Sequence, residues 1–249
     1  MITYKNQKEI KIMRVAGKML HQVLQGALKK VVPGASTAAI DQWIEAEILK
    51  LGGEPGFKLV KGYHWASCIS INDYVVHTPP SSRIIRDGDV VTIDSGVFLQ
   101  GLHTDAAWTV QAGKPTDEVT RFLEAGAKAV YDGIAKANPG NHIGDISQAI
   151  QAVIETAGYS IVRELSGHGV GRELHEEPTI PCFLNEPIEK TPKIRPGMTL
   201  AIEVMYGLGG RKITHDADGW SIKMADDTIA ASFEHTVLIT GQKGVILTG

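Results

Sequence analysis

The chain has 249 residues, 43% of them hydrophobic, and a formal net charge of -3, so it can bury a substantial core within one large domain. It has no Lys/Arg-rich tract and no aromatic-basic interleaving, which argues against nucleic acid as the ligand. No segment approaches the ~18 apolar residues of a membrane span, and the two cysteines, Cys68 and Cys182, form no disulfide framework. We therefore expect a cytoplasmic protein with no membrane partner.

The N-terminal part of the chain predicts two helices followed by short strands. Asn6 and Glu9 have the spacing of a capping box at the start of a helix over residues 7–30. A second helix is expected over residues 36–51, before the helix-ending glycines that follow it. Short strands are expected over residues 57–60, 67–72 and 75–77.

A β-hairpin is predicted next, with its tight turn at Gln100-Gly101. If the turn is centred there, Asp94 pairs with Ala107. Asp94 and Asp105 then become diagonal neighbours on one face, about 7–8 Å apart at the backbone. Two carboxylates directed at one place repel each other unless a proton or a cation lies between them. The hairpin therefore predicts a shared proton or a metal ion.

The second half of the chain repeats the pattern of the first. Helices are expected over residues 116–137 and 144–157, then a strand over 159–165, and the remainder is strand and loop. A shift of 106 residues aligns eight identical residues, beginning with Pro33-Gly34 on Pro139-Gly140. A shift of 109 places Ile93-Asp94 on Ile202-Glu203, each pair five residues after a glycine. This repeat is inferred to reflect two similar halves.

We expect these halves, approximately 1–112 and 113–249, to pack into one domain with strands inside and helices outside, an α/β (α+β) arrangement. Each half then contributes a glycine-led strand that ends in an inward-facing acid. A helix-hairpin pattern shared by chance remains the alternative to a true repeat. No linker between independent domains is visible.

Acidic residues within apolar strands point to a metal site. An isolated ionised carboxylate is too costly to bury, and few Lys or Arg residues lie near these acids. His168 lies between glycines, where the backbone can approach a ligand closely. Four carboxylates and one imidazole exceed the needs of one ion, which suggests two adjacent divalent ions. The alternative is that the acids form scattered ion pairs or turn caps. The five candidate ligands are Asp94, Asp105, His168, Glu203 and Glu234.

Several motifs together resemble type I methionine aminopeptidases, from the first helix to the C-terminus. They are Gly167-His168-Gly169-Val170-Gly171-Arg172, His175-Glu176-Glu177-Pro178, the Asp94/Asp105 hairpin, Met198 followed by Ile202-Glu203, and Glu234-His235-Thr236. The resemblance implies the pita-bread fold, a pseudo-twofold arrangement of a central antiparallel sheet with helices on the outside. It also implies an enzyme that removes the N-terminal methionine from nascent proteins when the second residue is small.

By the same resemblance, the five candidate ligands share two divalent ions (Co, Mn, Fe(II), Zn or Ni) with a bridging water or hydroxide. Glu203 is also the family's proton shuttle, and His77 and His175 contact the amide and the carbonyl oxygen of the substrate. Tyr63, Cys68 and Trp220 match positions that line the methionine pocket, with a buried core as the alternative. Nascent polypeptide N-termini are the implied partners, with contact to the ribosome left open, and the chain is expected to be a monomer.

The chain departs from the family pattern in its pocket. Val60 stands where bacterial relatives often have an aromatic residue, and Leu174 stands where Phe is common. A wider pocket that tolerates other apolar first residues is therefore one hypothesis. An Xaa-Pro aminopeptidase or prolidase-like enzyme and a non-catalytic binding protein on the same fold are the alternatives. His103 shares the face of Asp105 and is interpreted as a solvated turn residue rather than as a support for the site.

Overall fold

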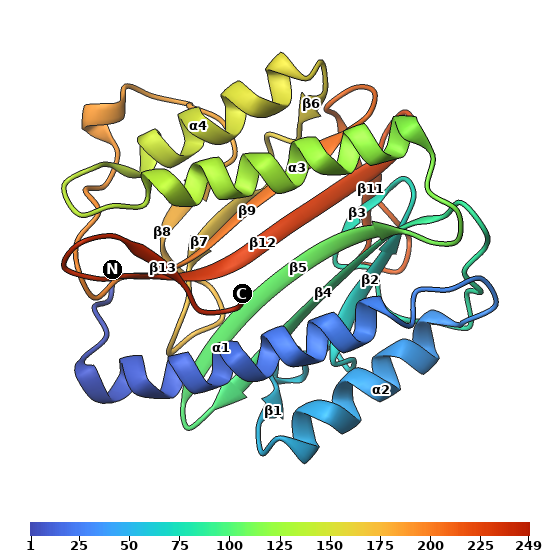
Figure 1. Cartoon of the computed structure of the whole chain (residues 1–249), viewed down its shortest axis with the longest axis horizontal. Helices are drawn as coiled ribbons and strands as arrows, with labels where there is room; N and C mark the ends of the chain where they lie inside the picture. The colour runs from blue at the N-terminus through green and yellow to red at the C-terminus, as the bar shows by residue number, and fades with distance from the viewer.

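The computed structural model describes all 249 residues, in four α-helices and three antiparallel sheets (Figure 1). The helices are α1 (Gln7–Leu28), α2 (Thr37–Lys50), α3 (Asp117–Lys136) and α4 (Ile143–Thr156), with short 3-10 helices at Gly56–Leu59 and Ile188–Lys190. The strands are β1 (Glu54–Pro55), β2 (Ser67–Ile71), β3 (Tyr74–Val76), β4 (Val90–Leu99), β5 (Leu102–Gln111), β6 (Ser160–Ile161), β7 (Ser166–Gly169), β8 (Glu176–Pro181), β9 (Thr199–Gly207), β10 (Ile213–His215), β11 (Ile222–Met224), β12 (Ala230–Ile239) and β13 (Gly244–Ile246).

All four predicted helices are confirmed within one or two residues at each end. The capping box at the start of α1 is present, because the Asn6 side chain accepts from the Glu9 N–H and Glu9 Oε2 accepts from the Asn6 N–H at 2.8 Å. α1 packs against β4 and β5, and α3 packs against β9 and β12. None of the helices combines the length and the apolar character that crossing a bilayer requires.

The predicted hairpin forms with the predicted register. β4 and β5 pair without a bulge, so Asp94 faces Ala107 and Asp105 faces Gly96. Gln100 and Gly101 have φ values of 49° and 86°, which is the pair of positive φ angles that a two-residue type I′ turn requires. β1 and β2 pair with successive parts of the opposite edge of β4 from β5. The two acids therefore lie on one face, as the alternation of side chains along a strand dictates.

The second large sheet has the order β13-β12-β9-β7-β8, with β6 beside β9. Glu234 on β12 lies directly opposite Glu203 on β9, and His168 on β7 lies opposite Ala201 on β9. Three neighbouring strands thus bring three of the candidate ligands together. The third sheet, β10-β11-β3, has three short strands.

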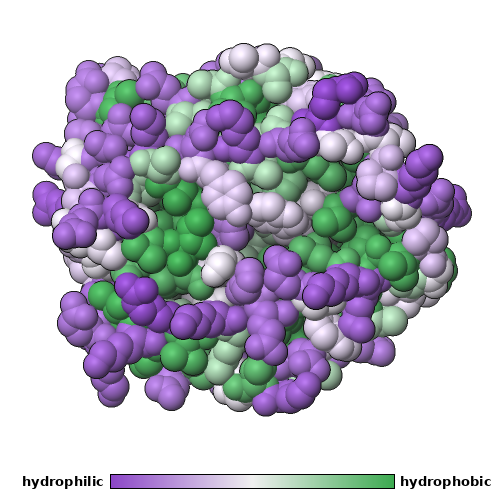
Figure 2. All heavy atoms as spheres, in the orientation of Figure 1, coloured by the Kyte–Doolittle hydropathy of each residue, from purple (hydrophilic) through white to green (hydrophobic).

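Two glycines that the 106-residue shift aligns have similar backbone conformations. Gly34 and Gly140, which are 106 residues apart, have φ values of 93° and 98°. Gly34 donates its N–H to the Ile85 carbonyl at 2.9 Å, and Gly140 donates to the Ile194 carbonyl at 3.1 Å. One buried apolar cluster includes residues of α3 and α4, and another includes residues of α1 and α2. Figure 2 shows hydrophilic side chains along α1 and α3, with hydrophobic atoms visible between them.

One strand prediction is wrong and another is correct only in part. Residues 57–59 belong to the 3-10 helix Gly56–Leu59, and the N–H of Val60, which follows it, donates to the Phe57 carbonyl at 3.0 Å. Gly56 lies against β4, where an added Cβ would be 3.3 Å from the Gly96 carbonyl, so close packing against another strand decides the conformation. The strand expected over residues 159–165 is reduced to Ser160–Ile161. Apolar runs of this length do not distinguish a strand from a turn of helix.

Candidate active site

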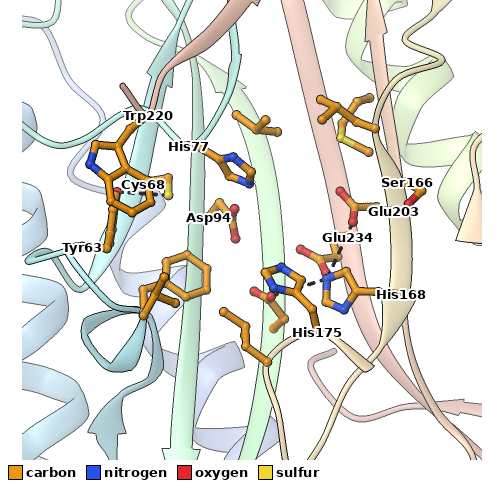
Figure 3. A pocket seen from close by; sticks show the side chains of 17 residues that line it. Tyr63, Cys68, His77, Asp94, Ser166, His168, His175, Glu203, Trp220 and Glu234 are labelled. Atoms are coloured by element: carbon orange, nitrogen blue, oxygen red, sulfur yellow. Dashed lines mark hydrogen bonds and ion pairs between the residues drawn. The ribbon is translucent and has the colours of Figure 1, made fainter. Parts of the chain in front are cut away.

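A cavity of about 200 Å³ lies where the two large sheets meet, and 17 residues line it (Figure 3). Asp94 and Asp105 enter it from the hairpin, and His168, Glu203 and Glu234 enter from the second sheet. All five predicted ligands therefore face one cavity. Figure 3 shows Glu203, Glu234 and His168 on one side, Tyr63, Cys68 and Trp220 on the other, and Asp94 between the two groups.

The tightest group in the cavity is Asp105, His168 and Glu234, each of which offers a ligand atom within 4.8 Å of the others. His168 Nε2 lies 4.0 Å from Asp105 Oδ2 and 4.0 Å from Glu203 Oε1. The other ring nitrogen, Nδ1, lies 2.9 Å from the Gly169 carbonyl oxygen. Because a carbonyl only accepts, Nδ1 is the protonated nitrogen and the lone pair of Nε2 faces the acids.

The acids of the cavity have raised pKa values. Burial raises the pKa of Asp94 to about 7. Burial also raises the pKa of Asp105, and the neighbouring charges of Asp94 and Glu203 raise it further. The same two causes, burial first and then the other acids, raise the pKa values of Glu203 and Glu234. Without a cation the group would have to hold protons, because carboxylates this close repel one another.

Three carboxylate oxygens of this group are buried without a hydrogen-bond partner. They belong to Asp94, Asp105 and Glu234. Buried polar atoms in native proteins are nearly always paired, so such a set indicates a missing partner. A divalent cation fits, since hard oxygen ligands with one imidazole suit Mn, Fe(II), Co or Zn. The structure thus favours a metal site over the alternative of scattered ion pairs.

His77 and His175 stand at the solvent-exposed rim of the cavity, on the side from which a substrate can enter. The ring of His175 makes an edge contact with His168, with 4.4 Å between the ring centres. Partial burial lowers the pKa values of both rim histidines, so they are neutral at pH 7. His77 also has a φ of 60°, a left-handed conformation that is uncommon for a residue other than glycine and that occurs at functional sites.

The apolar end of the cavity is a small cluster of aromatic, aliphatic and sulfur-containing side chains. The Tyr63 hydroxyl donates to the Ser67 carbonyl at 2.8 Å and contacts Cys68 Sγ at 3.1 Å. Tyr63 and Trp220 meet edge to face, with 5.1 Å between the ring centres. The predicted pocket residues Tyr63, Cys68, Trp220, Val60 and Leu174 all lie here.

Five residues that line the cavity lie outside the sequence prediction: Phe57, Val76, Leu165, Ser166 and Met205. Phe57 lies among the pocket side chains, but it was assigned to a strand that does not form. Met205 lines the cavity too, and its position two residues after Glu203 on the same strand was a usable signal.

His103 corrects a prediction. The sequence predicts a solvated turn residue at this position, but His103 is only 6% exposed and its Nδ1 atom has no hydrogen-bond partner. Its ring packs on Phe98, with 4.7 Å between ring centres, and burial lowers its pKa to about 4. The reason is tertiary: Gly56 and the Gly171 carbonyl cover the hairpin end, and the His103 N–H donates to that carbonyl at 2.6 Å.

Comparison with known proteins shows the family to which the chain belongs. The model of metallopeptidase family M24 matches residues 11–241. The chain belongs to metallopeptidase family M24. As a member of a metallopeptidase family, it is a hydrolase that uses a divalent metal, and the cavity acids with His168 are the candidate place for it.

Curated relatives of this M24 peptidase match over its full length. It is 41% identical to methionine aminopeptidase 1 of Bacillus subtilis over 248 residues, which cover 100% of this chain and 99% of the relative. It is 35% identical to the methionine aminopeptidase of Escherichia coli K12, covering 99% of this chain and 94% of the relative. These similarities place the chain with the methionine aminopeptidases of the family, as the motifs predicted.

Solved structures confirm the predicted fold. The crystal structure of the Thermotoga maritima methionine aminopeptidase superposes with a TM-score of 0.96 at 36% identity, covering 100% of this chain and 99% of the other. A prolidase from Pyrococcus furiosus superposes with a TM-score of 0.80 at 22% identity, and the match covers 99% of this chain but 65% of the prolidase. This M24 peptidase therefore has the pita-bread fold that both kinds of protein share.

Proposed function

We propose that this chain is a methionine aminopeptidase, which hydrolyses the first peptide bond of nascent proteins that begin with methionine followed by a small residue. The observation that carries the proposal is the junction within one cavity of a carboxylate-rich group and an apolar pocket lined by Tyr63, Cys68 and Trp220. An apolar, polarizable pocket suits a thioether side chain. The full-length similarity to methionine aminopeptidases supports the same assignment.

The proposed metal centre holds two divalent ions, drawn from Co, Mn, Fe(II), Zn and Ni. Four acids provide more oxygen ligands than one ion needs, and His168 presents an unprotonated Nε2 atom. When bound, the ions supply a water of lowered pKa and stabilise negative charge on the carbonyl oxygen under attack. The proposed ligands are Asp94, Asp105, His168, Glu203 and Glu234.

The protein groups around the reacting bond have separate tasks in this proposal. Glu203 accepts a proton from the attacking water at a carboxylate oxygen and returns it to the departing amine. His77 and His175, neutral at pH 7, each offer one N–H donor at the rim of the cavity. One of them donates to the carbonyl oxygen and the other holds the amide of the second residue.

Selectivity for the first residue depends on the width of the pocket. Val60 and Leu174 are smaller than the aromatic residues common at these places in the family, but Phe57 adds a ring to the same cluster. We propose that methionine is preferred and that the wider pocket also accepts other apolar first residues. The chain acts as one catalytic domain of two halves, approximately 1–112 and 113–249. We also propose a cytoplasmic monomer that meets its substrates as they leave the ribosome.

A peptide assay tests the proposal. The metal-loaded protein should hydrolyse Met-Ala-Ser much faster than Ala-Pro-Ala, lose activity in EDTA and regain it with added Mn²⁺. Faster cleavage of Ala-Pro-Ala would assign a prolidase-like activity instead. Activity unchanged by the chelator would refute the metal mechanism, and no hydrolysis by a metal-loaded protein would indicate a binding protein. Peptides that begin with Met, norleucine, Leu and Phe, each followed by Ala-Ser, then measure the selectivity.

A further inference from the structure

The two halves meet at β5 and β12, which run side by side through the centre of the molecule (Figure 1). These strands belong to different sheets and are not joined by a backbone ladder. Two threonine hydroxyls bridge them instead. Thr236 Oγ1 accepts from the Asp105 N–H at 2.9 Å and donates to the Asp105 carbonyl at 2.8 Å. Thr109 Oγ1 donates to the Ser232 carbonyl at 2.7 Å and accepts from the Ser232 N–H at 3.1 Å.

We call these contacts the Thr236 clasp and the Thr109 clasp. Each uses one hydroxyl as donor and acceptor toward a single residue of the facing strand, and the strands exchange roles between the two clasps. Both threonines are at most 2% exposed, so no water competes for the bonds. The clasps differ in two respects. Thr109 Oγ1 also lies 2.8 Å from Thr92 Oγ1 on β4, a side-chain contact that the Thr236 hydroxyl lacks. The Thr236 clasp holds the peptide groups of a candidate metal ligand, whereas the Thr109 clasp holds Ser232, which does not line the cavity.

We infer that Thr236 is a positioning residue that sets the metal affinity of the site by fixing Asp105 relative to Glu234. Asp105 comes from one sheet and Glu234 from the other, so the distance between them depends on how β5 and β12 are held together. The Asp105 carboxylate has an unpartnered oxygen, Oδ1, so its backbone is the part that the protein holds. Ligand positions must agree with the preferred metal–ligand distances to within a few tenths of an ångström.

The C-terminal end of the chain supports the Thr236 clasp from the other side. Thr248 Oγ1 accepts from the Thr236 N–H at 3.1 Å and lies 3.0 Å from His235 Nδ1. Leu247 donates its N–H to the Thr236 carbonyl at 2.8 Å. Thr236 is therefore held at both of its peptide groups while its hydroxyl holds Asp105. This inference rests on the proposed function only in taking Asp105 and Glu234 as metal ligands.

The test compares matched variants at the two clasps. Thr236→Val and Thr109→Val each remove one hydroxyl from the contact between β5 and β12 and keep the shape of the side chain. Calorimetric titration of metal-stripped protein with MnCl₂ should show affinity weakened about 10- to 100-fold in Thr236→Val, the effect typical of outer ligand supports. Thr109→Val should change it less than about threefold, and Thr236→Ser, which keeps the hydroxyl, should stay close to wild type. With Met-Ala-Ser, saturating Mn²⁺ should restore kcat in Thr236→Val with little change in KM.

Equal weakening in the two valine variants, or Mn²⁺ binding by Thr236→Val within about threefold of wild type, would overturn the inference. If Thr236→Val does not fold, Thr236→Cys and Thr109→Cys replace the valine pair, since a thiol is a weaker donor in the same place. Thr236→Cys should then bind Mn²⁺ at least about fivefold more weakly than Thr109→Cys. Wild-type protein that binds no Mn²⁺ would instead refute the proposed metal site, so the two failures are distinct.

Discussion

Replacement of Lys5 with methionine would test how the N-terminal segment holds the turn that carries His175. Lys5 Nζ lies 2.5 Å from Glu176 Oε2, and the two side chains are 1% and 5% exposed. The other oxygen, Glu176 Oε1, accepts from the Arg172 N–H at 2.6 Å, within the same turn. The lysine passes directly over Gly171, where an added Cβ would lie 2.1 Å from Lys5 Cε. A buried ion pair therefore ties the segment before α1 to the start of β8.

The two partners experience this pair differently. Burial alone raises the pKa of Glu176, but hydrogen bonds from Lys5 and Thr3 outweigh it and the pKa is lowered. Burial lowers the pKa of Lys5 in spite of the carboxylate beside it. The ion pair thus favours the ionised form of Glu176, whereas desolvation disfavours the charged form of Lys5. The Glu176 carboxylate also accepts hydrogen bonds from Thr3 and from two backbone N–H groups, and these favour its ionised form.

Lys5→Met leaves that carboxylate buried without its cation. Breaking a buried pair from one side costs about 3–5 kcal/mol. We expect the lower end, about 3 kcal/mol, since the Thr3 hydroxyl and two backbone N–H groups still donate to Glu176. For a domain of this size that corresponds to a fall in Tm of roughly 6–12 °C. The double variant Lys5→Met/Glu176→Gln removes both charges and should recover more than half of the loss.

Urea unfolding at pH 7 measures these free energies, and hydrogen exchange of the Arg172 and Glu173 amides reports the turn itself. Lys8→Met is the matched control, because Lys8 is exposed and its replacement should change the free energy of unfolding by less than about 0.5 kcal/mol. A loss below about 1 kcal/mol in Lys5→Met would refute the reasoning. Additive effects of the two single changes at Lys5 and Glu176 would refute it as well.

Three further predictions concern the site. Asp105→Ala should abolish turnover and remove one bound ion while the fold remains intact; wild-type metal content by elemental analysis would count against this ligand set. In the metal-free protein, burial raises the pKa of Asp94 from 3.8 to about 7. Between these two pH values the folded protein holds a proton that the unfolded chain releases. The free energy of unfolding should therefore fall as the pH rises from about 4 to 7. Denaturant titrations across that range check it, and excess Mn²⁺ should weaken the dependence. Leu174→Phe should lower kcat/KM for Phe-Ala-Ser at least about tenfold more than for Met-Ala-Ser, because an aromatic ring in place of the smaller leucine side chain narrows the pocket. Equal losses for the two peptides would show that residue 174 does not limit the width of the pocket.

Local signals in the sequence were enough for the helices and for the hairpin. Asn6 and Glu9 satisfy the first N–H groups of α1 from within a few residues, so the start of that helix is readable without the rest of the chain. A two-residue turn at Gln100-Gly101 and the two-residue period of a strand decide the pairing of Asp94 with Ala107. The glycine positions of the repeat are readable for the same reason, since a positive φ is a local requirement.

The sequence by itself therefore determined the secondary structure around the hairpin, the face that Asp94 and Asp105 share, and, through the motifs, the family of the chain. Only the tertiary structure decided that residues 57–59 belong to a 3-10 helix and that His103 is buried, because both depend on segments far away in the sequence. It also decided how Asp105 meets Glu234, since these acids come from different sheets. The Thr236 hydroxyl bridges β5 and β12 at this point. No local sequence pattern predicts a contact between two strands that share no backbone hydrogen bonds.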